Sequence, residues 1–211
     1  MGLFKFKKNT SSKKYEMLED EVMNYNGVTL HRIKKLDNDE LGGWIEKEEN
    51  LAQEGTCWVF QSAKVYGDAR VSGSAHVSGT AEVYDSAKVY NNAHVAKRSK
   101  VYGNAVIYDS AFIGDDVEVY GNAQVFENAK IYDSVKIYGN AKVYGDSIVS
   151  KMAEVYDNAQ IYNSAKVNSN SRIHEDAKIG GVSNIETDIE ICGNTIVRNS
   201  NEVNALYGIR E

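Results

Sequence analysis

The stretch from Ala81 to Ile107 reads AEVYDS AKVYNN AHVAKR SKVYGN AVI, and this six-residue repeat decides the fold. A Val or Ile returns at every sixth position, and an Ala precedes it by two positions in most hexads. The column continues without insertion through Val59, Val65, Val71, Val77, Val83, Val89, Val95, Val101, Ile107, Ile113, Val119, Val125, Ile131, Ile137, Val143, Val149, Val155, Ile161, Val167, Ile173, Ile179, Ile185, Ile191, Val197 and Val203.

Each hexad predicts a short β-strand followed by a turn. The Ala and the Val or Ile are two residues apart, so in a strand they face the same side. Pairs such as Gly67-Asp68 and Asp85-Ser86 follow and suit tight turns. A period of six does not keep one face of a helix, so a helix is excluded. Winding the strands into a solenoid buries the Val/Ile column and stacks each coil on the next.

A second period of 18 residues defines the coil. The residues that precede the Val/Ile column alternate in charge at this spacing: Lys64, Glu82, Lys100, Glu118, Lys136, Glu154, Arg172 and Glu190. Opposite charges on neighbouring strands attract, so these residues are expected to lie one above another. Three hexads therefore make one coil. The prediction is an all-β parallel β-helix, a triangular solenoid of about eight coils, about 38 Å tall.

Composition excludes several functional classes. The 211 residues carry 24 Lys and Arg against 30 Asp and Glu, a net charge of -6, which argues against a nucleic-acid-binding protein. The longest apolar runs are too short for a membrane span. Cys57 and Cys192 are far apart in the chain, which disfavours a disulfide framework and favours a cytoplasmic location.

The repeat does not cover the ends of the chain. Residues 1–14 contain Lys5, Lys7, Lys8, Lys13 and Lys14 without an acid, and are expected to be a disordered tail or a contact for an acidic partner. Residues 15–56 are assigned as an N-terminal cap, because a terminal coil otherwise exposes apolar surface. Within it, residues 28–36 alternate like a strand after the Asn26-Gly27 turn, and Trp44 with Ile45 are expected to plug the first coil.

The repeat is assigned to residues 57–204 and a C-terminal tail to residues 205–211. Leu206, Tyr207 and Ile209 are apolar and follow the last hexad at once. They are expected to fold over the last coil or to contact another subunit.

The hexads resemble those of the hexapeptide-repeat proteins, whose fold is a left-handed parallel β-helix. The hand of the predicted helix is implied by this resemblance. Leu41-Gly-Gly-Trp-Ile-Glu, together with Cys57-Trp-Val-Phe at the start of the repeat, is similar to the YdcK-like subgroup. That subgroup occurs in bacteria and phages and is often described as transferases.

The resemblance raises the question of catalysis. Acyl-CoA-dependent transferases of this fold usually need a catalytic His and an external loop, whereas no insertion breaks the hexads here and no C-terminal helix is evident. Zinc enzymes of this fold need three His ligands, but only His76 and His94 share a column, with His174 on another column and His31 in the cap. We therefore predict no metal and no cofactor. The rival interpretation is an acyltransferase of the hexapeptide family that binds acyl-CoA at a subunit interface and uses His76 or His94.

Two sets of residues are candidates for binding. Trp58, His76, His94 and Phe112 precede the Val/Ile column and form an apolar run on an outward position. Such a run marks either a contact surface or a face that the N-terminal segment covers. A second column, expected either to stack structurally or to contact a partner, contains Tyr66, Tyr84, Tyr102, Tyr120, Tyr138 and Tyr156.

Together these features predict a non-enzymatic interaction protein with a protein partner. The resemblance to phage-borne members implies binding or inhibition of a host protein, such as a defence factor. Self-association is also expected, as a dimer through Leu206, Tyr207 and Ile209 or as a trimer through the side column from Trp58 to Phe112.

Overall fold

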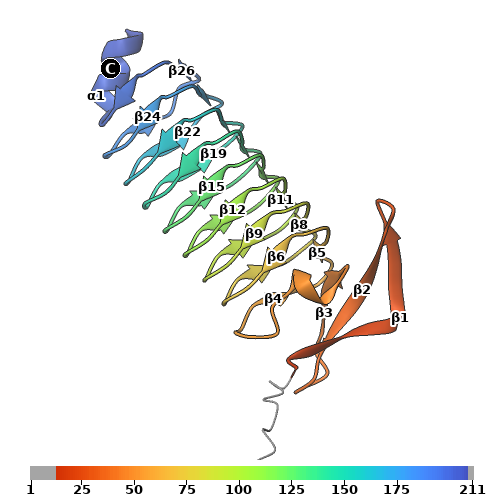
Figure 1. Ribbon diagram of the computed structural model, residues 1–211. Helices are drawn as coiled ribbons and strands as arrows, with labels where there is room; N and C mark the ends of the chain where they lie inside the picture. The colour runs from red at the N-terminus through yellow and green to blue at the C-terminus, as the bar shows by residue number, and fades with distance from the viewer. Residues whose placement is uncertain (1–12, 209–211) are drawn as a thin grey trace, which may run out of the picture.

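The computed structural model describes residues 13–208 as a parallel β-solenoid with three sheets (Figure 1). The first sheet contains β1 (Tyr15–Tyr25), β2 (Val28–Lys35), β3 (Leu41–Ile45), β5 (Lys64–Val65), β8 (Glu82–Val83), β11 (Lys100–Val101), β14 (Glu118–Val119), β17 (Lys136–Ile137), β20 (Glu154–Val155), β23 (Arg172–Ile173) and β26 (Glu190–Ile191). The second contains β6 (Arg70–Val71), β9 (Lys88–Val89), β12 (Val106–Ile107), β15 (Gln124–Val125), β18 (Lys142–Val143), β21 (Gln160–Ile161), β24 (Lys178–Ile179) and β27 (Ile196–Val197). The third contains β4 (Trp58–Val59), β7 (His76–Val77), β10 (His94–Val95), β13 (Phe112–Ile113), β16 (Lys130–Ile131), β19 (Ile148–Ser150), β22 (Lys166–Asn168) and β25 (Asn184–Ile185).

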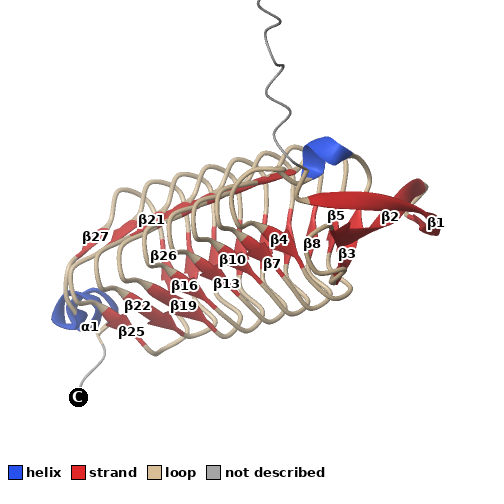
Figure 2. Cartoon of the chain, turned by 90° about the horizontal axis from the view of Figure 1, so that it is seen from below, coloured by secondary structure: helices blue, strands red, loops and turns tan. Residues whose placement is uncertain are grey.

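The strand register confirms the 18-residue coil. Within the repeat, each strand pairs in parallel with the strand three places further along, so that His94 lies opposite Phe112 and Lys100 lies opposite Glu118. The coils consequently stack like the turns of a spring (Figure 2). The alternating charges face one another as expected, because each pair is separated by one coil.

The inward placement of the Val/Ile column is also confirmed. From Val59 to Val197 every member of the column is at most 1% exposed. The Ala positions, such as Ala87 and Ala123, are fully buried beside them. The small Ala and the larger branched residue fill the narrow interior of the prism together, which gives one continuous apolar core along the solenoid.

The turns at the corners require backbone in the left-handed region. Gly121 and Gly139 adopt φ of 70° and 69°, and Asp157, the next residue of that column, adopts 55°. Aspartate tolerates this region because its short side chain bonds to nearby backbone. Here the Asp157 carboxylate accepts a hydrogen bond at 3.2 Å from the backbone N–H of Glu175 in the next coil. The turn residues therefore also join neighbouring coils.

A row of asparagines strengthens one corner. The side-chain amide of Asn104 donates to Asn122, Asn122 to Asn140, Asn140 to Asn158, and Asn158 to Asp176, at 3.1–3.2 Å. Each inner member both donates and accepts, so the row links five coils. Such ladders of identical amides are typical of stacked parallel strands.

Replacing Asn122 with alanine is expected to lower the free energy of unfolding by about 1–2 kcal/mol, because two hydrogen bonds of the row are lost. Chemical denaturation measures the change. The matched control is Asn92→Ala, since the Asn92 side chain is exposed and makes no hydrogen bond within residues 13–208. Equal losses in the two variants would contradict a stabilising role of the row.

The N-terminal cap is a three-stranded extension of the first sheet. Strands β1 and β2 form an antiparallel hairpin around the expected turn at Asn26-Gly27, and β2 pairs antiparallel with β3. Strand β3 then pairs in parallel with β5, so that Ile45 lies opposite Val65. The hairpin stands beside the first coils of the prism (Figure 1). The strand predicted after the turn is confirmed as β2.

The plug over the first coil differs from the prediction. Ile45 is buried as expected, but Trp44 lies on the outer side of β3, where the Arg32 guanidinium is 5.2 Å from its ring. The apolar end is covered instead by Tyr15 and Ile33, which are fully buried. Trp44 was misassigned because neighbouring residues of a strand face opposite sides, so only one of the two can point inward.

The cap also adds a turn to the solenoid. Ile45 pairs above Val65 on the first sheet, and Leu51, next to the 3-10 helix η1 (Glu48–Asn50), bridges to Val71 on the second. The solenoid therefore has about nine turns rather than eight. These cap residues adopt the geometry of a coil without its hexad sequence, which is why the repeat alone gave too few turns.

The C-terminal end contradicts two expectations. The last member of the column, Val203, lies in the helix α1 (Ser200–Tyr207) rather than in a strand, and the chain does have a C-terminal helix. Asn199 caps the helix by accepting from the Glu202 N–H at 3.1 Å, and Gly208 ends it in the left-handed region. Val203 remains 2% exposed, so the helix still closes the last coil.

Candidate binding surface

The predicted tyrosine column forms a stacked ladder along one corner of the prism. Ring centroids are 4.7–5.0 Å apart and interplanar angles are 1–6° through Tyr66, Tyr84, Tyr102, Tyr120, Tyr138, Tyr156 and His174. The separation matches the spacing of neighbouring coils, so each ring lies directly on the next. The structure thus brings together all six tyrosines that were candidates for binding.

Two tyrosine hydroxyls of this ladder donate to carboxylates of the next coil. Tyr102 donates to Glu118 at 3.2 Å, and Tyr66 donates to the buried Glu82 at 3.0 Å. Burial raises the pKa of Tyr84 to about 12, with Glu82 as a further cause. A tyrosine hydroxyl with the ordinary pKa of 10.0 is already protonated at neutral pH, so these groups are hydrogen-bond donors to the carboxylates. These contacts favour the structural role of this column.

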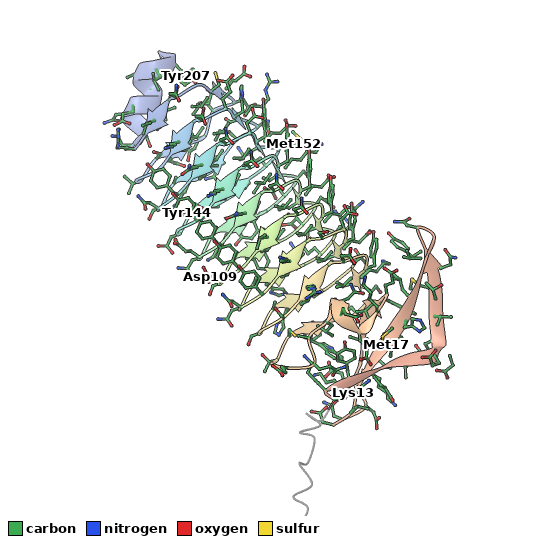
Figure 3. All side chains as sticks on the ribbon, viewed as in Figure 1. Lys13, Met17, Asp109, Tyr144, Met152 and Tyr207 are labelled. Carbon is green, nitrogen blue, oxygen red and sulfur yellow. The ribbon has the colours of Figure 1, made fainter. Side chains whose placement is uncertain are left out.

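A second ladder follows the next corner. Its rings are Tyr90, Tyr108, Phe126, Tyr144 and Tyr162, with centroids 4.8–5.7 Å apart. Tyr144 is seen at this corner in Figure 3. Both ladders arise from the residue that follows the Val/Ile column, because that position points outward at the start of each turn.

The third corner is built differently and carries the aromatic strip, which we define as Phe60, His76, His94, Phe112 and Tyr132. Edge-to-face or tilted contacts join these rings in that order, with centroids 5.1–5.8 Å apart. Phe60 and Tyr132 come from the position after the Val/Ile column, whereas the three rings between them come from the position before it. The strip is therefore continuous although its residues come from two different positions of the hexad.

Small residues make this change of position possible. Ser78, Ala96 and Gly114 occupy the corner position in the coils of His76, His94 and Phe112. A Cβ atom at Gly114 would lie 2.6 Å from Cε1 of Phe112, so the phenyl ring occupies the space that a side chain would need. Each strip ring is half-buried, with one part packed on the corner and the other facing solvent.

Charged residues border the strip in its middle coils. The guanidinium of Arg98 donates to both carboxylate oxygens of Asp116, at 2.6 and 2.5 Å, and Lys97 forms an ion pair with Asp115. Each of these pairs joins two neighbouring coils. An aromatic centre beside a polar rim is the composition found in protein–protein interfaces.

His94 is a member of the strip whose imidazole can ionise, and its surroundings shift its pKa. Its Nε2 lies 3.1 Å from the hydroxyl of Ser78, and burial, with His76 as a second cause, lowers the pKa of His94. The folded protein therefore favours the neutral imidazole. Because folding disfavours the charged imidazole, the free energy of unfolding is highest above the ordinary pKa of 6.5. It decreases as the pH falls below that value.

Replacing His94 with phenylalanine is accordingly expected to flatten the pH dependence of stability. The wild-type Tm should fall between about pH 7.5 and pH 5.5, where histidine titrates and carboxylates remain ionised. The His94→Phe variant keeps a ring in the strip but cannot ionise, so its Tm should fall less. Thermal unfolding at several pH values measures this. Equal pH dependence in both proteins would contradict the coupling.

Trp58 does not belong to the exposed surface that the sequence suggested. It is 2% exposed, its ring meets Tyr15 edge-to-face at 6.0 Å, and the Lys35 ammonium lies 5.1 Å from it. The sequence left open whether this column is a contact surface or is covered by the N-terminal segment. At Trp58 the second alternative is confirmed. His76, His94 and Phe112 lie beyond the cap and remain half-exposed.

The remaining candidates lie at the ends of the chain. Leu206 and Tyr207 are 56% and 40% exposed on α1, and Ile209 lies outside the described residues. Of the basic N-terminal residues, Lys14 donates to the backbone oxygen of Cys57 at 2.9 Å, and Lys5, Lys7 and Lys8 lie outside the described residues.

Comparison with known proteins supports the assignment of the repeat. Residues 63–79 match the family model of the YdcK beta solenoid repeat. The hexads are of the YdcK β-solenoid type. Residues 63–79 cover strands β5 to β7, which hold one member of each of the three sheets, so the matched segment is one coil of the prism. No curated protein is similar enough to count as a match. None of the helices within residues 13–208 has the length and apolar character needed to cross a membrane.

The sequence did not identify the full aromatic strip. Phe60 and Tyr132 extend the strip at its two ends, and neither was a candidate, because they belong to a different column from Phe112. A signal was nevertheless present, since an aromatic residue before the Val/Ile column coincides with a small residue after it at Phe112 and Gly114.

Proposed function

We propose that the protein is a non-enzymatic binding protein that contacts another protein through the aromatic strip. The observation that carries this proposal is the continuous row of five rings on one corner of the solenoid, half-exposed and bordered by ion pairs. Aromatic residues supply much of the binding energy in protein interfaces. A rigid solenoid also holds the rings in place before binding, which lowers the entropic cost.

The partner that we propose is a host protein, and the resemblance to phage-borne relatives suggests a defence factor. This proposal rests on that resemblance, and the cytoplasmic location remains a prediction in the same way. Self-association also remains a prediction. Leu206 and Tyr207 are the described residues available for a dimer, whereas a trimer contact through the side column would have to use His76, His94 and Phe112 without Trp58.

Site-specific crosslinking tests the proposed surface. A photoreactive benzoylphenylalanine replaces Phe112 in one protein and Phe126 in a matched control, because both are half-buried phenylalanines but lie on different corners. We expect one cellular protein to crosslink at position 112 and not at position 126. That protein, once purified, should bind the Phe112→Ala variant at least about tenfold more weakly than wild type, and the Phe126→Ala variant normally. Equal binding of both variants would refute the proposal.

The alternative that we keep is an acyl-CoA-dependent acyltransferase, with His76 or His94 as the catalytic base. The hydrogen bond between His94 and Ser78 is the contact that favours it, since a base next to a hydroxyl resembles an activated nucleophile. Incubation with acetyl-CoA and a panel of amine and hydroxyl acceptors tests this alternative. Turnover that disappears in His76→Ala or His94→Ala would establish the enzyme and overturn our preference.

A further inference from the structure

The free edge of strand β1 is a second surface that is distinct from the aromatic strip. Within residues 13–208, strand β1 is the terminal strand of the 11-stranded sheet and pairs only with β2. It has 11 residues, whereas the strands β4 to β27 have two or three. An unpaired edge of this length presents a run of backbone N–H and C=O groups that can pair with another chain.

Three adjacent acids of this edge are uncompensated, whereas Glu16 of the same strand pairs with Lys34 at 2.8 Å. Glu19, Asp20 and Glu21 are exposed, and none of these carboxylates is in an ion pair within residues 13–208. The three acids lie in an irregular segment of β1, between Met17 opposite Ile33 and Val22 opposite His31. Val22 follows the acids and is 49% exposed. The edge therefore combines free backbone groups, negative charge and an exposed apolar residue.

The hairpin that carries this edge is held in place. The hydroxyl of Tyr25, at the tip of the hairpin, donates to Glu82 of the second coil at 2.8 Å. The Tyr25 ring meets Tyr66 edge-to-face at 6.1 Å, and the Lys64 ammonium lies 4.6 Å from the Tyr25 ring. Because the tip is anchored on the solenoid, the edge is ordered before any partner binds, which lowers the cost of binding.

From these observations we infer that β1 binds an extended basic peptide segment by strand addition. Backbone hydrogen bonds to the flank from Val22 to Tyr25 supply affinity, and lysine or arginine side chains near Glu19, Asp20 and Glu21 supply specificity. The same acids disfavour the pairing of β1 with a second copy of itself, because like charges would then meet. The irregular segment limits regular pairing to its two flanks, and the flank from Val22 to Tyr25 contains the exposed apolar residue.

A fluorescent synthetic peptide of alternating lysine and valine tests this inference with the full chain. Fluorescence anisotropy should show saturable binding that weakens with salt, and hydrogen exchange should show new protection at Val22–Tyr25. The triple variant Glu19→Gln, Asp20→Asn, Glu21→Gln should bind at least about tenfold more weakly. The control variant Glu54→Gln, Glu127→Gln, Glu186→Gln has the same change in net charge at other exposed sites, and should bind like wild type.

Three results would overturn the inference. Equal binding by the two triple variants would place the peptide elsewhere. Equal binding of a peptide with alternate backbone nitrogens methylated would indicate a contact through charge alone, without strand addition. Protection of Val22–Tyr25 that depends on protein concentration and not on peptide would assign the edge to a second copy. None of these measurements involves Phe112, so they are independent of the proposed function.

Discussion

Replacing Ile137 with aspartate is expected to unfold the middle coils of the solenoid. Ile137 is fully buried in β17 and lies between Val119 and Val155 of the neighbouring coils. The described core around it is apolar, so the carboxylate would be buried without a partner or would have to be protonated. The free energy of unfolding should fall on the order of 4 kcal/mol or more.

Hydrogen exchange locates this effect, and chemical denaturation measures its size. Protection should be lost first in β14, β17 and β20, because each coil of a solenoid contacts mainly its neighbours. The control is Ser134→Asp in the same coil, where the side chain is exposed and the new charge is solvated. An unchanged unfolding transition in Ile137→Asp would mean that the register of the repeat is wrong.

Replacing Trp58 with alanine is expected to detach the N-terminal cap from the first coil. The indole is buried against Tyr15, and Cζ2 of the ring would lie 2.7 Å from a Cβ atom at Gly42, so Trp58 fills the space between the cap and the solenoid. The loss of this side chain should cost about 3–5 kcal/mol. Limited proteolysis should then cut the cap within β1 to β3 while β4 to β27 resist.

The variant Trp44→Ala is the matched control, because that indole lies on the outside of β3 with Arg32 beside it. Its cost should be smaller by about 2 kcal/mol or more, since a half-exposed cation–π contact contributes little. A stable Trp58→Ala protein with an intact cap would mean that the indole contributes little to holding the cap on the first coil.

The repeat explains why so much of this fold could be predicted. In a solenoid each residue contacts its equivalents 18 positions before and after it, as Lys100 does with Glu82 and Glu118. A pattern along the sequence is therefore also a pattern of contacts in space, so the sheet register, the inward column and the tyrosine ladder followed from spacing alone. Local signals also predicted the hairpin turn at Asn26-Gly27.

The ends of the molecule and the aromatic strip depended on tertiary structure. Leu51 completes a coil without a hexad, and Trp58 is buried because Tyr15, 43 positions earlier, folds onto it. Val203 keeps its inward position within a helix that Asn199 and Gly208 delimit. The strip exists because Phe112 turns over Gly114 to meet Tyr132. The features that could be predicted from the sequence are those in which each residue contacts its own equivalent one coil away. The ends and the strip depend on contacts between segments that share no period, and only the folded chain shows which of these segments meet.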